Sequence, residues 1–112
     1  MNDKELADIT EQIAKWAKEE PLIANIYLFG SRIRGDFKEY SDLDVAIELD
    51  PNNIKNDFSE GGLATWIHSA PAWRKKIQMF LKVTLHLEWY HPLYTPKVGN
   101  ALQMSSILIF KK

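Results

Sequence analysis

The chain has 112 residues, with 14 lysines and arginines against 15 aspartates and glutamates, no cysteine and 46% hydrophobic residues. A chain of this size buries one hydrophobic core, so we expect a single domain over residues 1–112 without a separate lobe for a large substrate. The net charge of -1 gives no general attraction for nucleic acid, and the absence of cysteine excludes disulfides, thiolate chemistry and cysteine-based zinc sites.

The first half of the chain predicts a helix followed by two strands. Between residues 3 and 20 the apolar residues recur at steps of three and four, which is typical of one helical stripe, and Asn2 with Glu5 resembles a capping box. Residues 22–29 are apolar on both alternating faces, as in a strand that is covered on both sides. Residues 43–49 alternate between apolar and mostly polar side chains and predict a second strand.

The second half of the chain is less regular. Residues 51–70 predict a loop with one short helix, and Pro71 predicts the start of a longer helix. Residues 83–90 alternate as a third strand, residues 95–103 predict another helix, and residues 107–110 predict a last short strand or a packed tail.

This order of elements describes an α/β (α+β) fold in which a small mixed sheet of three to four strands has helices packed on it. No apolar run reaches the ~18 residues of a membrane span, and the N-terminus lacks the basic start and apolar run of a signal peptide. We therefore expect a cytoplasmic protein that contacts neither membrane nor nucleic acid directly.

A strand, a tight turn and a second strand carry the residues with the clearest chemistry. Asp42 and Asp44 are two positions apart on a strand, so their side chains leave the same face, about 7 Å apart at the Cα atoms. Two carboxylates on a partly apolar strand fit Mg²⁺. Gly30 allows a close approach of backbone to phosphate, Ser31 offers a hydroxyl and an N–H, and Arg34 supplies a positive fork. The segment predicts a site for a nucleoside triphosphate and a metal.

The same residues resemble the minimal nucleotidyltransferases of the DNA polymerase beta superfamily, whose signature is Gly-Ser, ten residues and then Asp-x-Asp. The Gly-Ser pair at 30–31 and the Asp-Leu-Asp at 42–44 have that spacing. The wider family pattern also matches, except that Ile33 stands where alanine is usual. The resemblance implies the polymerase beta-like nucleotidyltransferase fold, two Mg²⁺ ions and ATP as the substrate.

The resemblance also implies a third carboxylate on a later strand, beside the first two. We predict Glu88 for this position, because it lies on the polar-alternating face of the third strand between apolar residues. Aspartate is the commoner residue there in the family. His86 shares that face, but a lone histidine on a strand is more often packed than catalytic, so we leave it out. Arg32 remains open as a second phosphate ligand or a surface charge. The predicted catalytic and metal-binding residues are Asp42, Asp44 and Glu88, and the predicted nucleotide-binding residues are Gly30, Ser31 and Arg34.

These features predict an enzyme that transfers a nucleoside monophosphate, by preference AMP from ATP, to a hydroxyl group of a partner protein. The resemblance implies that the partner is a HEPN-domain protein and that the pair acts as toxin and antitoxin, with the antitoxin adenylylating a tyrosine. An alternative of another class is a non-enzymatic antitoxin or binding module that neutralises its partner by contact. Transfer to an aminoglycoside or another small alcohol would need a longer acceptor domain. The nucleotide used and the formation of homo-oligomers stay open.

Overall fold

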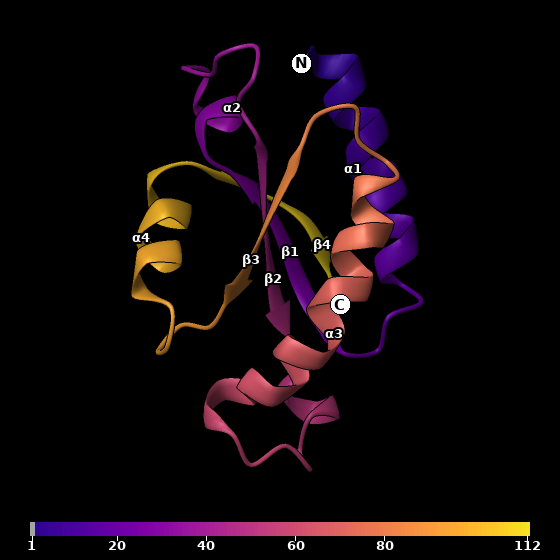
Figure 1. Cartoon of the computed structure of the whole chain (residues 1–112), viewed down its shortest axis with the longest axis vertical. Helices are drawn as coiled ribbons and strands as arrows, with labels where there is room; N and C mark the ends of the chain where they lie inside the picture. The colour runs from indigo at the N-terminus through magenta and orange to yellow at the C-terminus, as the bar shows by residue number, and fades with distance from the viewer. Residues whose placement is uncertain (1) are drawn as a thin grey trace.

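The computed structural model describes residues 2–112, which form a four-stranded sheet with helices on both faces (Figure 1). The strand order is β3-β2-β1-β4, so β3 and β4 are the two edges. Strand β1 (Ile23–Phe29) runs antiparallel to β2 (Leu43–Leu49) and to β4 (Ser106–Lys111), whereas β2 runs parallel to β3 (Leu85–Tyr90). The sheet is therefore mixed, which confirms the predicted fold class.

The helices divide between the two faces of this sheet. Helices α1 (Asp3–Ala17) and α3 (Leu63–Gln78) lie on one side and α4 (Pro96–Met104) lies on the other (Figure 1). The shorter elements are a single helical turn α2 (Ser31–Arg34) and two 3-10 turns, η1 (Pro51–Asn53) and η2 (Glu60–Gly62). Within residues 2–112 no helix is both long enough and apolar enough to cross a bilayer.

The core lies between the sheet and helices α1 and α3. Alternate residues of β2, Leu43, Val45 and Ile47, are fully buried because they share the face that these helices cover. Ile13 of α1 and Ile77 of α3 are buried in the same cluster. The side chains of β2 that alternate with this row point to the opposite face, where α4 lies. Burial of one face thus leaves the other available for polar side chains.

The predicted start of the first helix is confirmed, because the Asn2 side chain accepts a hydrogen bond of 2.8 Å from the backbone N–H of Glu5. Strands β1 and β2 match the predicted ranges 22–29 and 43–49 within one residue. The segment 107–110, for which a packed tail was the alternative, belongs to a strand that pairs with β1 along the sheet edge.

The prediction that a helix begins at Pro71 is wrong. Helix α3 begins at Leu63 and Pro71 lies inside it. The Asp57 carboxylate anchors the first turn by accepting hydrogen bonds from the backbone N–H (2.9 Å) and the hydroxyl (2.6 Å) of Thr65. These bonds satisfy groups that the start of a helix leaves without intrahelical partners. They form between positions eight residues apart, so the local sequence pattern did not reveal the helix start.

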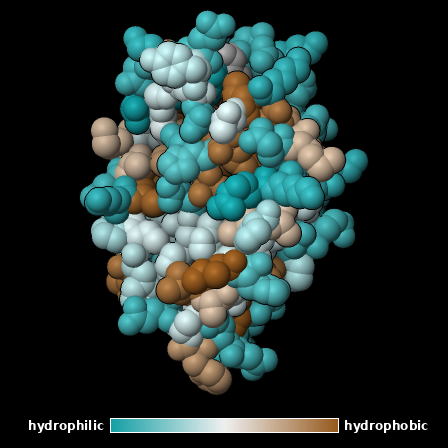
Figure 2. Space-filling model, in the orientation of Figure 1, coloured by the Kyte–Doolittle hydropathy of each residue, from teal (hydrophilic) through white to brown (hydrophobic). Residues whose placement is uncertain are grey.

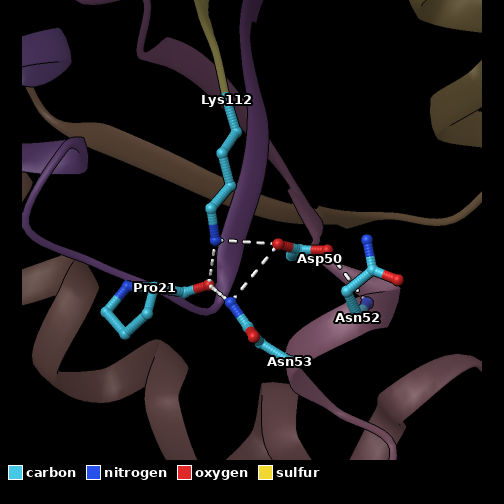
Figure 3. A network of polar contacts seen from close by, with 5 residues as sticks. All are labelled: Pro21, Asp50, Asn52, Asn53 and Lys112. Carbon is cyan, nitrogen blue, oxygen red and sulfur yellow. Dashed lines mark hydrogen bonds and ion pairs between the residues drawn. The ribbon is translucent and has the colours of Figure 1, made fainter.

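A polar network joins the residue after β2 to the segment before β1 and to the residue after β4 (Figure 3). The Nζ atom of Lys112 lies 2.7 Å from the Asp50 carboxylate and 2.6 Å from the Pro21 carbonyl. The Asn53 side chain donates to the same carbonyl at 2.6 Å, and the Asn52 backbone N–H donates to Asp50 at 2.9 Å. The hydrogen bonds from Lys112 and Asn52 stabilise the ionised carboxylate and lower the pKa of Asp50.

Candidate active site

The turn after β1 lies directly against the second aspartate of the signature. Antiparallel pairing sets Phe29 opposite Asp44, and Gly30 follows with a φ of 84°, which is unfavourable for other residues. A Cβ atom on Gly30 would lie 1.8 Å from Oδ2 of Asp44. Glycine is therefore required here for two reasons, backbone conformation and contact with the carboxylate.

Helix α2 begins at Ser31 and ends at Arg34, and the φ of 96° at Gly35 closes the turn. Arg34 lies in this turn with its side chain 40% exposed, and its Nε atom is 3.3 Å from Oδ1 of Asp36. An exposed ion pair of this kind is weak. The guanidinium of Arg34 is thus free to exchange Asp36 for a phosphate group.

Arg32 makes contacts of a different kind. Its Nε and Nη2 atoms donate to the carbonyl groups of Ser41 (2.8 Å) and Glu39 (3.1 Å), and its guanidinium lies 4.9 Å from the centre of the Phe37 ring. These contacts hold the loop between α2 and β2 and so position Asp42 at the end of that loop. The structure gives Arg32 a role in loop structure, which the sequence had left open.

Asp44, His86 and Glu88 form a linked row on the face of the sheet that α4 covers. The parallel pairing of β2 with β3 sets His86 beside Asp44. The Nδ1 atom of His86 lies 3.0 Å from Asp44, and its Nε2 atom lies 2.7 Å from Glu88. The ring can donate to both carboxylates when both nitrogens carry protons. Glu88 is therefore connected to Asp44 through His86, a residue that sequence reasoning had set aside.

The environment of Asp44 disfavours its charge. Burial raises the pKa of Asp44, and the negative charges of Asp42 and Glu88 raise it further, while His86 offsets part of the effect. A cation at this position would relieve the repulsion, and two carboxylates with water and phosphate oxygens suit Mg²⁺. The donor chemistry of Asp42 and Asp44 thus fits the metal. Across residues 2–112 no three His, Cys, Asp or Glu side chains are grouped to hold an ion together.

A small cleft of about 200 Å³ lies beside this row and adds a residue that the sequence did not single out. Its lining includes Asp44, His86 and Glu88 of the sheet and Lys97 of α4. A lysine beside the carboxylates brings a positive charge to a site expected to bind phosphate. Neither strand alternation nor motif spacing could predict that Lys97 lies in this cleft or that His86 contacts Asp44. The first depends on how α4 packs on the sheet, and the second depends on how β3 pairs with β2.

A mixed sheet that presses a Gly-Ser turn against an Asp-x-Asp strand is the arrangement that the signature predicted for a nucleotidyltransferase. Residues 11–83 match the family model described as Polymerase beta, Nucleotidyltransferase. The chain belongs to this family, as the signature predicted.

The chain is also similar to individual known proteins, among them one curated relative and one solved structure. A Methanocaldococcus jannaschii protein named "Putative protein adenylyltransferase MJ1379" is 39% identical over 56 residues, which are 50% of this chain and 55% of that protein. The chain thus matches about half the length of this curated relative. A solved structure described as "Crystal structure of the toxin-antitoxin with AMP-PNP" superposes with a TM-score of 0.57 at 17% identity, over 100% of this chain and 75% of that one. At this identity the likeness concerns the fold.

Proposed function

We propose that this chain transfers AMP from ATP to a hydroxyl group of a partner protein in the cytoplasm, in a reaction that needs Mg²⁺. The observation that carries the proposal is the contact of the Gly30 turn with Asp44, which joins a phosphate-binding turn to a strand bearing two carboxylates. The name of the relative from M. jannaschii supports adenylyl transfer to protein. The toxin-antitoxin neighbour supports a toxin as the partner, and the resemblance of the signature implies that this toxin is a HEPN-domain protein.

Each residue of the site has a place in this reaction. The backbone at Gly30, the Ser31 hydroxyl and the Arg34 guanidinium bind the triphosphate. Asp42 and Asp44 would hold Mg²⁺, which when bound neutralises charge that develops on the phosphates.

The transfer itself makes one bond and breaks another. The acceptor oxygen forms a bond to the α-phosphorus, the bond from this phosphorus to pyrophosphate breaks, and the acceptor proton passes to a carboxylate. Asp44 lies nearest to this step, and Glu88 acts on it through His86, which holds Asp44 by Nδ1 and Glu88 by Nε2.

Incubation of the protein with Mg²⁺, ATP and a HEPN-domain protein as the candidate partner tests the proposal. Intact-mass spectrometry should show the partner heavier by one or more AMP units. Asp42→Asn with Asp44→Asn should lower transfer by at least ~10²-fold, the scale of a lost metal-positioning group. Glu48→Gln is the matched control, because Glu48 lies on the same strand but bonds to Asn25 outside the site.

The alternative is a non-enzymatic antitoxin, and the observation that favours it is that His86 lies between Glu88 and Asp44 and contacts both carboxylates. Tight binding of the partner without transfer, under any nucleoside triphosphate, would support this alternative and refute the enzyme. Glu88→Gln separates the roles further. If it leaves transfer unchanged, Glu88 has no part in the reaction.

A further inference from the structure

A groove of about 650 Å³ lies beside β3, with its walls formed by α3 and α4, the helices that flank β3 in Figure 1. Most of its lining is apolar or aromatic, including Leu63, Trp66, Ile67, Leu87, Trp89 and Tyr94. Leu63, Ile67 and Tyr94 are exposed. Figure 2 shows hydrophobic side chains on the face of the molecule that β3 crosses in Figure 1. Neighbouring exposed apolar side chains of this kind mark binding surfaces more often than isolated ones do.

The groove is continuous with the candidate active site. Glu88, Lys97 and Val98 line both the groove and the small cleft that holds Asp44 and His86. If the hydroxyl group that reaches Asp44 belongs to a side chain of the acceptor protein, the residues on either side of that side chain also come close to the site. The groove is the surface that extends from the carboxylates and could receive those residues.

The outer edge of β3 offers free backbone groups to such a segment. The carbonyl of Thr84 accepts a hydrogen bond from β2, so alternation along the strand turns the backbone groups of Leu85, Leu87 and Trp89 outward. The Gln78 side chain contacts this edge only at its start, where it donates to the carbonyl of Val83 and accepts from the N–H of Leu85. Within residues 2–112 no strand pairs with the remainder. An unpaired strand edge is a template for another extended chain.

One buried donor in the groove has no partner. The indole N–H of Trp89 is buried, and in the part of the chain that the structure describes it contacts no acceptor. Buried donors without acceptors are uncommon in native proteins. Because this N–H is covered, an acceptor group on a bound segment would complete the hydrogen bond only if the side chains around Trp89 moved on binding.

We propose that the groove binds the acceptor protein, through an extended segment that pairs with the outer edge of β3 and places apolar side chains between α3 and α4. This inference rests on the proposed function. It assigns a sequence preference to the acceptor, namely that apolar residues flank the hydroxyl-bearing residue. Ile67 and Leu63 determine this preference because they present apolar surface at the wall of the groove.

Two blocked six-residue peptides test the inference, one with a tyrosine flanked by valine and leucine and one with a tyrosine flanked by serine and glycine. Calorimetry in the presence of Mg²⁺ and α,β-methylene ATP measures binding without transfer. The apolar peptide should bind at least about tenfold more tightly. Ile67→Asp should abolish the difference, and so should Leu63→Asp, which leaves an acidic residue favourable to the helix start. Met79→Asp, the same change on an exposed residue of the α3 C-terminus, should preserve it.

Equal binding of the two peptides, or unchanged binding in Ile67→Asp and Leu63→Asp, would overturn the docking site. Weaker binding of ATP itself in these variants would assign the groove to the nucleotide and overturn it as well. A second experiment with ATP separates this inference from the proposed function. Groove-dependent peptide binding without AMP transfer would support the docking site and refute the enzyme. AMP transfer that is unchanged by Ile67→Asp and by Leu63→Asp would support the enzyme and refute the docking site.

Discussion

Asp44 combines a role in the proposed reaction with a cost in stability. Its side chain is half-buried on a strand, next to Gly30 and between two other acids, and burial raises its pKa. A carboxyl group whose pKa is higher in the folded than in the unfolded state destabilises the fold where it is ionised, and this loss disappears as pH falls through the raised pKa. The site is therefore strained electrostatically until a cation binds.

Asp44→Asn should accordingly increase the free energy of unfolding at pH 7 in the presence of EDTA, while it abolishes transfer. The gain should shrink as the pH is lowered toward 4, because wild-type Asp44 then becomes protonated. Urea denaturation at several pH values measures both effects. A lower stability of Asp44→Asn at pH 7 would mean that the His86 contact outweighs the desolvation of Asp44.

The two arginines of the signature turn should respond differently to truncation. Arg34→Ala should weaken ATP binding by about 1 to 3 kcal/mol, the scale of a charge-assisted hydrogen bond, with little change in stability, because its partner Asp36 is exposed. Arg32→Ala should lower stability, since it removes the contacts to two carbonyl groups and the Phe37 ring. Calorimetry and thermal unfolding separate the effects. The opposite result would mean that Arg32 binds the phosphates.

At the scale of elements, α3 shows how a loop can determine where a helix starts. The residue that first suggests a helix start, Pro71, lies inside the helix and is exposed. Proline lacks the N–H that would donate to the carbonyl four residues earlier. The helix continues through it because Trp73 and Ile77 are buried against the sheet on one side and Asp57 holds the first turn on the other. Tertiary packing outweighs the local penalty.

Pro71→Ala should therefore stabilise the protein, by about 1 to 3 kcal/mol, because it restores one helical hydrogen bond and relieves a steric clash. Greater freedom of the unfolded chain removes part of this gain. Chemical denaturation measures the change. As a comparison, Ala72→Gly at the adjacent exposed position should lower the free energy of unfolding by about 1 kcal/mol. If Pro71→Ala destabilises the protein, the proline ring contributes packing that its exposure does not suggest.

At the scale of the whole molecule, the network around Asp50 joins the last strand to the end of β2 and to the connection after α1 (Figure 3). The Asp50 carboxylate is buried and Lys112 is partly exposed, so solvent screens the pair only in part. A lowered carboxyl pKa contributes stability that is present above the unfolded pKa of about 3.9 and is lost as the pH falls through the lower folded value.

Lys112→Met should lower the free energy of unfolding at pH 7 by about 1 to 2 kcal/mol, because the buried carboxylate keeps only its hydrogen bonds to asparagine. The difference from the wild type should shrink as the pH falls through the lowered pKa of Asp50, because the carboxyl group then becomes protonated. Lys111→Met is the control, since Lys111 is exposed on the neighbouring position and should change stability by less than about 0.5 kcal/mol. A difference that persists at low pH would assign the effect to something other than the ion pair.

The sequence by itself determined the elements whose signals are local. The helical stripe up to Ala17 and the alternation from Leu43 to Leu49 predicted α1 and β2. When one face of a helix or strand is buried, its apolar residues recur along the sequence at the period of that element. The signature turn was predictable for a similar reason. Its glycine, serine and aspartates stand at the spacing of the family signature, and the proposed binding of phosphate and metal needs such side chains on adjoining ends of two strands.

Only the tertiary structure decided the features that depend on contacts between distant segments. The parallel register of β2 and β3 places His86 between Asp44 and Glu88, and the packing of α4 brings Lys97 to the same cleft. A one-residue change of that register would turn His86 to the opposite face of the sheet. Strand alternation reports which residues share a face, but it does not report which residue of the next strand lies opposite, and this is why the composition of the site required the folded chain.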